Sequence, residues 1–391
     1  MNPRRTRRPE PSRQERDRRF LRLALRLARR GCGATSPNPM VGAVLVRRGQ
    51  IIGRGWHRRA GGPHAEIEAL QQARQKGQTV KGATLYVTLE PCSTQGRTPP
   101  CTEALKAAGL RRVVIGATDP NPRHRGRAFA ILRRAGIAVT SGILARECAQ
   151  LNEAFNHWIV RRVPFVTVKA AMTLDGKIAT ATGESRWITG GPARAWGMKL
   201  RQGADAILVG INTVLADNPR LTVRPRPSGA RRAASAAADG RLRRIVLDAR
   251  ARTPLRARVV SDAWAPLTTI VVGASAPPRR VAALARRVRV LVAPASRGQI
   301  NLPWLLRRLG AENVTHLLVE GGGEVNASFL LSGLAQRVVF FYAPKILGGR
   351  GARRAVAGEG ARARAECLRL TEVEWRRLGA DWRMSARVAA A

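Results

Sequence analysis

Apolar residues recur along the chain in two alternating periods, and the order of these periods predicts layered α/β structure. From residue 18 to about 160, short apolar runs of strand character alternate with segments in which apolar residues return every three or four positions. The segment VGAVLVRRGQIIGRGW at 41–56 predicts a β-hairpin, because an Arg-Arg-Gly turn separates two apolar runs. Strands that alternate with helices in this way favour an α/β domain with a largely parallel sheet.

The same alternation begins again near residue 163 and predicts a second α/β domain, 163–391, after a boundary at about 160. A helical segment covers GPARAWGMKLRQGA, and the strand in DAILVGINTVLADNP runs into a loop. Further apolar runs predict buried strands in RRIVLDA, LTTIVVG, VRVLVA, THLLVEGGG and RVVFFYAPKILGG. Residues 225–242 are low in complexity, so we expect a flexible insertion there, and the closing residues carry no clear pattern.

The first residues of the chain are basic and polar, and residues 1–17 predict a disordered tail. One face of an amphipathic helix follows, because four apolar residues lie at i, i+3, i+4 and i+7: Leu21, Ala24, Leu25 and Ala28. We interpret this helix as the first of the domain at 18–160, with a helix on a membrane surface as the alternative. The chain contains no run of eighteen apolar residues and no signal-peptide core, so no membrane span is expected.

The formal net charge of +45 by itself favours a nucleic-acid-binding protein. Most of the positive residues are Arg scattered over the chain, and the aromatic content of 4% is too low for the stacking platforms of single-strand binders. We therefore expect a generally basic composition, which helps to attract anionic substrates, and no nucleic-acid partner. Cys32, Cys148 and Cys367 lie far apart, so we expect buried thiols, no disulfide framework and a cytoplasmic protein.

Three residues with metal-ligand chemistry stand at the ends of predicted elements. His64 follows Gly-Gly-Pro at a helix start, Cys92 follows a strand, and Cys101 opens another helix after two prolines. One imidazole and two thiolates leave a fourth tetrahedral position for water, as a catalytic zinc site requires. Glu66 would close the site if it were a ligand, so we assign it the transfer of a proton from water to a leaving amine. A structural zinc site is the alternative, although no fourth ligand is obviously placed for it.

The combination of His-Ala-Glu with a later Pro-Cys resembles the zinc-dependent nucleobase deaminases. In the nucleic-acid and nucleoside deaminases the two cysteines are spaced two apart, whereas eight residues separate Cys92 from Cys101. The first domain instead resembles the deaminase half of the bifunctional riboflavin-biosynthesis deaminase–reductases, through SPNPMVGAVLV, GWHRRAGGPHAEIEAL, YVTLEPCSTQGRTPPCTEAL and GATDPNP. This resemblance implies a cytidine-deaminase-like α/β/α fold, bound zinc, and hydrolytic removal of the 2-amino group of a phosphorylated diaminopyrimidinone.

The same resemblance implies further residues of this site. Asn38 would contact the pyrimidine ring or the ribose, and His57 would lie near the pocket. The loop between the two cysteines offers side chains suited to the substrate phosphate, some of which would only hold the turn: Ser93, Thr94, Arg97 and Thr98.

A glycine run at 321–323 in the second domain leaves a predicted strand and enters a predicted helix. Backbone N–H groups at a helix start bind phosphate, but the spacing is not that of the Gly-x-Gly-x-x-Gly fingerprint, so a Rossmann fold is not expected. Together with TLDGKIATATGESRWIT and LRQGADAILVGINTVLADNPRLTVR, the segment LLVEGGGEVNASFLLSG resembles the reductase half of the same family. The resemblance implies a dihydrofolate-reductase-like α/β fold, NADPH as hydride donor, and reduction of the ribose of the deaminated product to a ribityl chain.

The resemblance to the reductase half assigns residues to two ligands. Cofactor contacts would be Ala171, Trp187, Thr213, Asp217, Gly322, Gly323, Glu324, Val325, Asn326, Ala327 and Ser328. Substrate contacts would be Ser185, Arg201, Leu221, Arg224 and Glu320, of which the two Arg forks suit a phosphate. Lys169 and Asp175 are further pocket candidates. Ala249 stands where a relative with Ser would contact the cofactor, so that contact comes from the backbone or is missing.

The favoured function is a zinc-dependent deaminase joined to an NADPH-dependent reductase. Such an enzyme would be cytoplasmic, act on a phosphorylated pyrimidine, bind neither nucleic acid nor membrane, and pair through its reductase domain. A nucleic-acid-base deaminase with an appended domain is one alternative, motivated by the net charge. A metal-binding structural protein without catalytic activity is the other.

Overall fold

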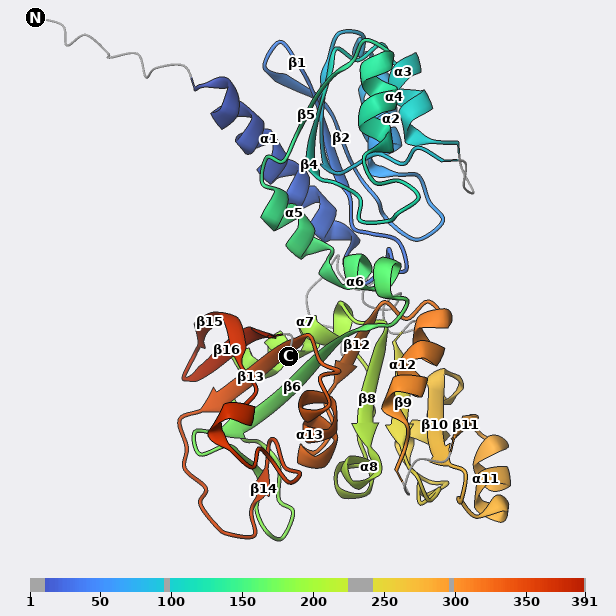
Figure 1. The fold of residues 1–391 in the computed structure, drawn as a ribbon, viewed down its shortest axis with the longest axis vertical. Coiled ribbons are helices and arrows are strands. Elements are labelled where there is room, and N and C mark those ends of the chain that lie inside the picture. Colours follow the sequence, from blue (N-terminus) through green and yellow to red (C-terminus); the bar gives the residue numbers. More distant parts are fainter. Residues whose placement is uncertain (1–10, 95–98, 224–241, 295–298, 390–391) are drawn as a thin grey trace, which may run out of the picture. The chain divides into compact units, whose positions relative to one another are not determined.

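The computed structural model of the chain describes residues 11–94, 99–223, 242–294 and 299–389. The chain forms two compact units, Met1–Val160 and Arg161–Ala391 (Figure 1). Each unit is built on its own sheet. Among the described residues, no helix combines the length and the apolar character that crossing a membrane would take.

The sheet of the first unit has the strand order β2-β1-β3-β4-β5. Its strands are β1 Gly42–Arg47, β2 Gln50–Trp56, β3 Thr84–Leu89, β4 Arg112–Ala117 and β5 Ala138–Ser141. β1 pairs antiparallel with β2, which confirms the predicted hairpin, and also with β3. Only the β3–β4 and β4–β5 pairs are parallel, so the sheet is mixed and the expectation of a largely parallel sheet is wrong for this unit. A hairpin turn necessarily joins antiparallel strands.

Helices cover both faces of this sheet, which confirms the α/β/α prediction. The helices of the unit are α1 Arg13–Ala28, α2 Ala65–Gln75, α3 Cys101–Ala107, α4 Arg127–Arg134, α5 Ala145–Leu151 and α6 Glu153–Arg161, with a 3-10 turn at Arg29–Gly31. Successive residues of a strand point to opposite faces, so Val44 packs against α1 while Leu45 packs against α2. Figure 1 shows α1 and α5 on one side of the sheet and α2, α3 and α4 on the other.

The first helix begins earlier than the sequence predicts. Helix α1 starts at Arg13, so the expectation of a disordered tail up to residue 17 is wrong for the last part of that range, while residues 1–10 lie outside the described residues. A capping box starts the helix: the Ser12 hydroxyl accepts from the Glu15 amide, and the Glu15 carboxylate accepts from the Ser12 amide. This reciprocal pair satisfies two amide donors that a helix start leaves unpaired.

Asp17 ties α1 to the sheet through a buried ion pair. Its carboxylate accepts hydrogen bonds from two nitrogens of Arg112 at 2.9 and 2.7 Å and from the hydroxyl of Tyr86 at 2.9 Å. We expect Asp17→Ala to destabilise this unit by about 3–5 kcal/mol, because the Arg112 charge would stay buried without its partner. Hydrogen exchange of the β4 amides, measured in the full chain, reports this loss separately from the second unit.

The matched control for this prediction removes both charges. Asp17→Ala combined with Arg112→Met should cost less free energy of unfolding than Asp17→Ala alone, since no charge is then left buried and unpaired. A double variant that is at least as unstable as the single one would contradict the ion-pair explanation.

The sheet of the second unit has the strand order β11-β10-β9-β8-β12-β6-β13-β16-β15. Its strands are β6 Phe165–Thr173, β8 Ala206–Gly210, β9 Arg243–Leu247, β10 Thr268–Gly273, β11 Arg289–Ala293, β12 His316–Val319, β13 Arg337–Ala343, β15 Leu370–Leu378 and β16 Asp381–Val388. The strands from β11 to β13 in this order are parallel, and they include every buried strand predicted for this domain. β15 and β16 add an antiparallel hairpin that the sequence analysis did not predict. Nearly all of β15 is exposed, and charged residues separate its few apolar ones, so it does not show the apolar run of a buried strand.

Helices also cover both faces of the second sheet. They are α7 Gly191–Gln202, α8 Ile211–Asp217, α10 Arg258–Ser261, α11 Pro278–Ala285, α12 Leu302–Ala311 and α13 Gly323–Leu331, with 3-10 turns at Ala265–Leu267 and Arg364–Glu366. Leu208 of β8 packs in the core that α12 and α13 cover, whereas its neighbour Ile207 packs in the core formed with α8, α10 and α11. A short two-stranded ladder pairs β7 Lys177–Ala179 with β14 Arg353–Arg354.

Three expectations about this chain need correction. Residues 211–217 form helix α8 where a loop was expected after β8. Leu242, the last residue of the flexible insertion expected at 225–242, is buried in the core, so that expectation is wrong for this residue; residues 224–241 lie outside the described residues. Cys148 is buried as expected, but Cys32 and Cys367 are exposed.

Candidate active sites

The three metal-ligating residues predicted in the first unit lie together in the structure. The Nδ1 atom of His64 lies 3.2 Å from the Sγ atom of Cys101 and 3.5 Å from that of Cys92, and the three ligand atoms all lie within 4.8 Å of one another. In a tetrahedral zinc site with ordinary Zn–N and Zn–S bond lengths, neighbouring ligand atoms are about 3.5 Å apart. The observed spacing and the donor set therefore fit zinc.

Local backbone conformation explains how residues so far apart in the sequence converge. His64 is the N-cap of α2 and is extended, with φ −73° and ψ 161°, so its side chain leaves the helix axis before the first turn closes. Glu66 follows within that first turn and is buried. Cys92 comes just after β3, and Cys101 is the first residue of α3 after Pro100. A strand end and two helix starts thus meet at one point, as the sequence predicts.

The surroundings of Cys92 favour a thiolate. The pKa of Cys92 is lowered to about 4 despite its burial. The largest cause is a hydrogen bond from the thiol of Cys101, followed by hydrogen bonds from His64 and from the backbone amide of Cys101, the latter at 3.2 Å. A deprotonated sulfur is the form that binds a metal ion. Burial acts in the opposite direction on the neighbouring carboxyl group and raises the pKa of Glu66. A raised pKa suits a carboxyl group that takes up a proton and releases it near neutral pH.

His57 and Asn38 form a second layer beside the metal ligands. The His57 Nδ1 atom lies 2.9 Å from the carbonyl oxygen of Pro63, so this nitrogen donates, and Nε2 is left to accept from the Asn38 amide at 3.2 Å. Burial lowers the pKa of His57, which favours this neutral form. His57 therefore holds the backbone immediately before His64, and the two imidazole rings meet edge to face at 5.4 Å.

Glu90 is a site residue to which the sequence analysis gave no role. It is buried directly before Pro91-Cys92, and its carboxylate accepts from the backbone amides of Asp119, Gly126 and Ala128 at 3.0–3.1 Å. These bonds fix the segment after β4 against the site. In the sequence, Glu90 lies in TLEPC and Asp119 in DPNP. These motifs could have drawn attention to both residues, but neither motif shows that the Glu90 carboxylate bonds to the backbone of Asp119.

The phosphate contacts expected in the loop between the cysteines are only partly described. The Ser93 hydroxyl is buried and makes no hydrogen bond within the described residues, and the Thr94 hydroxyl lies 3.5 Å from Nδ1 of His124. Arg97 and Thr98 lie outside the described residues.

In the second unit, a cavity of about 980 Å³ gathers most of the residues expected in the reductase site. The expected cofactor contacts that line it are Ala171, Trp187, Thr213, Asp217, Gly322, Gly323, Glu324, Val325 and Asn326. The expected substrate contacts that line it are Ser185, Arg201, Leu221 and Glu320, and Lys169 joins them. One cavity therefore collects residues from β6, α7, α8, α13 and the segment that follows β12.

Several of the expected reductase residues do not line this cavity. Ala327 is buried in the core, and the Ser328 hydroxyl donates to the Glu324 carbonyl at 2.8 Å on its own helix. Asp175 instead accepts from the amides of Leu347 and Gly348 and holds that loop. Ala249 does not line the cavity either, and its carbonyl accepts from the amide of Gly273. Arg224 lies outside the described residues.

The glycine run joins β12 to α13 where side chains would not fit. Gly322 is the N-cap of α13, and a Cβ atom on Gly323 would lie 2.2 Å from the carbonyl oxygen of Arg354. A Cβ atom on Gly322 would instead lie 3.6 Å from the hydroxyl of Thr213 on α8. The backbone of Arg354 therefore excludes a side chain at Gly323, whereas a Cβ atom on Gly322 would only touch Thr213.

A buried carboxylate at the cavity wall holds two cations. Nε and Nη2 of Arg201 donate to the two oxygens of Glu320 at 2.9 Å each, and the Lys169 ammonium lies 3.7 Å from the same carboxylate. Burial alone would raise the pKa of Glu320, but Arg201 and then Lys169 outweigh it and hold the pKa at about 2. The fork of Arg201, expected to bind phosphate, is thus occupied by Glu320, with Nη1 donating to the Thr222 carbonyl.

Trp187 presents an exposed ring to the cavity between two arginines. Its ring centroid lies 4.7 Å from the guanidinium carbon of Arg194 and 5.9 Å from that of Arg186. Asp217 accepts from the Ser185 hydroxyl at 2.8 Å, which joins this segment to the end of α8. An exposed indole at a cavity offers a flat face on which an aromatic ligand can stack.

Known proteins show the same two-part organisation. The family model for the cytidine and deoxycytidylate deaminase zinc-binding region matches residues 14–117, and the model for the RibD C-terminal domain matches residues 164–384. The riboflavin biosynthesis protein RibD of Aquifex aeolicus is 44% identical over 335 residues, which cover 86% of this chain and 89% of that protein. RibD of Escherichia coli is 40% identical over 331 residues, which cover 84% of this chain and 88% of that protein.

Solved structures agree with these sequence matches. The structure of Acinetobacter baumannii RibD is similar with a TM-score of 0.83 at 35% identity, over 96% of this chain and all of that one. A diaminohydroxyphosphoribosylaminopyrimidine deaminase/5-amino-6-(5-phosphoribosylamino)uracil reductase from Thermotoga maritima is similar with a TM-score of 0.80 at 33% identity, over 97% of this chain and all of that one.

Proposed function

The chain belongs to the RibD family of riboflavin biosynthesis enzymes, and we propose that it divides the family's two reactions between the histidine–cysteine cluster and the 980 Å³ cavity. The enzyme is a deaminase and a reductase that acts on phosphorylated pyrimidines. Its similarity to RibD proteins extends over both units, which decides against a nucleic-acid-base deaminase with an appended domain and against a structural protein.

We propose that His64, Cys92 and Cys101 hold a zinc ion in the first unit. The support is the spacing of the three ligand atoms and their chemistry, one imidazole nitrogen and two sulfurs, which fits zinc. Zinc in such a three-ligand site supplies Lewis-acid activation of water at neutral pH. His57 and Asn38 would keep His64 in the orientation that binds the metal, through the bond to the Pro63 carbonyl.

We propose that Glu66 moves the proton of the deamination. Hydrolysis forms a bond from the water oxygen to the ring carbon and breaks the bond from that carbon to the 2-amino nitrogen. The carboxylate of Glu66 would accept a proton from the water and return it to the departing nitrogen, which leaves as ammonia. The observation that carries this role is a buried carboxyl group on the first turn of α2, two residues after His64 and in contact with Cys101.

We propose that the cavity of the second unit binds NADPH along the glycine turn and against Trp187. Backbone amides at the start of α13 suit a diphosphate, and the exposed indole suits a flat ring. The hydride chemistry belongs to the cofactor. Purified zinc-loaded protein, given the diaminopyrimidinone phosphate and NADPH, should release ammonia and then consume NADPH; absence of both activities would reject the proposal.

We propose that Lys169 supplies the proton that completes the reduction. A hydride added to the sugar C1 of an open-chain imine requires a proton at the imine nitrogen, and the Lys169 ammonium lines the cavity beside Glu320. We expect Lys169→Met to lower kcat of reduction by about 10²-fold or more with little change in NADPH binding. Stopped-flow measurement of NADPH oxidation tests this, and an unchanged kcat would reject the role.

Lys199→Met is the matched control for that variant. Lys199 is exposed on α7 and does not line the cavity, although it carries the same charge. Its replacement should leave the reduction rate unchanged, so a general effect of lost positive charge can be separated from a role at the site.

We propose that two chains pair through the free edge of β15. This strand ends the sheet, so its outer backbone groups have no strand partner among the described residues, and it exposes Val373 and Trp375 by 49% and 57%. Pairing of two such edges around a twofold axis would extend both sheets. We expect Trp375→Glu to shift the protein from dimer to monomer in sedimentation velocity, whereas Val292→Glu on β11, at the opposite edge, should not. A wild-type protein that sediments as a monomer would reject this interface.

A further inference from the structure

Residues 218–222, which follow α8, form one wall of the reductase cavity, and all five of them line it. Asn218 and Leu221 have positive φ angles of 40° and 53°, which residues other than glycine rarely adopt. The side chain of Leu221 is 3% exposed and packs in the core of this unit. A backbone conformation of this kind persists only where the surrounding structure holds it in place.

Two arginines hold the backbone on either side of Leu221. Nη1 of Arg201 donates to the carbonyl oxygen of Thr222 at 2.9 Å, and Nη1 of Arg244 donates to that of Arg220 at 2.9 Å. Arg201 lines the cavity, whereas Arg244 does not: it lies on β9 and is fully buried. Leu221 therefore lies between two anchored peptide groups, one of which is held from outside the cavity.

Every donor of the Arg244 guanidinium is used. Besides the bond to Arg220, its Nε donates to the hydroxyl of Thr268 at 2.8 Å. The remaining N–H groups donate to both carboxylate oxygens of Asp262 at 2.8 Å and to the carbonyl oxygen of Val259 at 3.0 Å. An arginine side chain has five N–H donors, so each of them has an acceptor here. A residue with another arrangement of donors cannot make the same five bonds.

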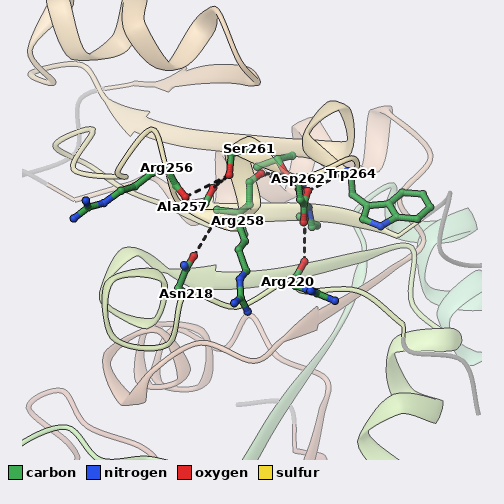
Figure 2. A network of polar contacts seen from close by, with 11 residues as sticks. Asn218, Arg220, Arg256, Ala257, Arg258, Ser261, Asp262 and Trp264 are labelled. Carbon is green, nitrogen blue, oxygen red and sulfur yellow. Dashed lines mark hydrogen bonds and ion pairs between the residues drawn. The ribbon is translucent and has the colours of Figure 1, made fainter.

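The same guanidinium also supports the 218–222 wall through α10. Asp262, which pairs with Arg244, directly follows this helix, and the amide of Arg258 at the start of the helix donates to the side-chain oxygen of Asn218 at 2.8 Å. Figure 2 shows Asn218 and Arg220 on the same side of this network, below the α10 segment that carries Arg258 and Asp262. Arg244 thus fastens the wall directly at Arg220 and, through α10, at Asn218.

The 218–222 wall adjoins the residues to which we assign the chemistry of the reduction. Its last residue, Thr222, is bonded to Arg201, which pairs with Glu320, and the Lys169 ammonium lies 3.7 Å from that carboxylate. Lys169 is the proposed proton donor, so the reacting sugar carbon belongs at this end of the cavity. The proposed NADPH contacts at the glycine turn and at Trp187 lie on other segments. A displaced wall should therefore weaken binding of the pyrimidine substrate more than binding of the cofactor.

We propose that Arg244 is a positioning residue for the reduction, which holds the 218–222 wall in the shape that receives the pyrimidine substrate. The proposal rests on the proposed reductase function and adds to it a residue that acts from outside the cavity. Arg244 touches neither ligand. Without its bonds, the backbone at Leu221 is free to leave the left-handed conformation, and the wall shifts.

Arg244→Lys tests this role, because lysine keeps the charge opposite Asp262 but has a single nitrogen in place of the planar fork. We expect the Kd of the deaminated product to rise about 10-fold and kcat/KM of reduction to fall about 10²-fold, as for other groups misplaced by changes away from the chemistry. The Kd of NADPH should stay unchanged. Isothermal titration calorimetry gives both Kd values, and stopped-flow measurement of NADPH oxidation gives the rates. Equal losses of affinity for both ligands would show a merely structural role and overturn the proposal.

Arg243→Lys is the matched control. Arg243 is the neighbouring residue on β9, donates to the Glu312 carboxylate at 3.0 Å and does not line the cavity. Its replacement should leave the Kd values of both ligands unchanged. An Arg244→Lys protein that binds the deaminated product as tightly as this control would overturn the proposal.

Asp262→Asn decides the question if Arg244→Lys does not fold. This variant keeps the guanidinium but removes one of the carboxylate oxygens that orient it, and Asp262 does not line the large cavity. It should raise the Kd of the deaminated product by less than Arg244→Lys, again without a change for NADPH. A Kd for that product equal to the wild-type value would overturn the proposal.

Calorimetry also separates this proposal from the reductase function itself, because it needs no turnover. A wild-type protein that binds the deaminated product without oxidising NADPH would reject the reductase function, while the comparison of Kd values would still decide the role of Arg244. A wild-type protein that does not bind the deaminated product would reject both.

Discussion

Replacing Glu66 by Gln is expected to lower the rate of ammonia release by about 10²–10⁴-fold, the range typical of a lost general acid–base. The amide has nearly the same shape as the carboxyl group but cannot take a proton from water. Because Glu66 is not one of the three clustered ligands, the zinc content should stay the same. NADPH-dependent reduction should also stay the same, since that site lies in the other unit.

The measurements are ammonia release, zinc content by atomic absorption, and NADPH oxidation with the deaminated product as substrate. Glu68→Gln is the matched control: Glu68 lies on the same helix, and its carboxylate pairs with Arg58 at 2.9 Å. Full deamination by Glu66→Gln would remove Glu66 from the mechanism. Loss of zinc from this variant would show that the carboxylate supports the metal site instead.

Replacing His64 or Cys101 by Ala is expected to remove both the zinc and the deamination. Each variant leaves only two of the three ligands, whereas a catalytic zinc site is held by three protein ligands. The rate of ammonia release should fall by more than the roughly 10–100-fold caused by removing a residue that only orients a ligand. That smaller fall is the effect we expect for His57→Ala. A chelator should reproduce the loss in the wild-type protein.

The rate of the reductase reaction in these variants tests whether the two sites are independent. Both variants, given the deaminated product and NADPH, should oxidise NADPH at the wild-type rate, because the cavity lies wholly in the second unit. Cys32→Ala is the control for a missing thiol, since Cys32 is exposed and outside the cluster. A His64→Ala protein that keeps its zinc would reject His64 as a ligand.

Much of the deaminase site could be predicted because its signals are local. Prolines and glycines stop or start elements, so Pro63 before His64 and Pro100 before Cys101 place both ligands at helix starts. The glycine run at 321–323 marks a strand-to-helix turn for the same reason, and the structure shows backbone too close there for a Cβ atom. Strand faces also follow from the sequence, because apolar residues alternate along them.

Pairings across long separations could not be predicted in this way. Arg201 and Glu320 are 119 residues apart; both were expected to bind substrate, but the ion pair between them was not predicted. Asp17 and Arg112 are 95 residues apart, and their ion pair ties the first turns of α1, at the end of the expected tail, to the sheet. The charge of a residue is visible in the sequence, whereas its partner depends on which elements the sheet brings side by side.

The sequence by itself determined the residue types that carry the chemistry and the elements that present them: His64, Cys92 and Cys101 at element ends, Glu66 on the first turn of a helix, and glycines at the start of α13. Only the tertiary structure decided which charges are already paired. It committed Arg201 to Glu320 and Asp17 to Arg112. The physical reason is that periodicity and turn chemistry act within a few residues, while electrostatic pairing acts through space between segments that only the folded chain brings together.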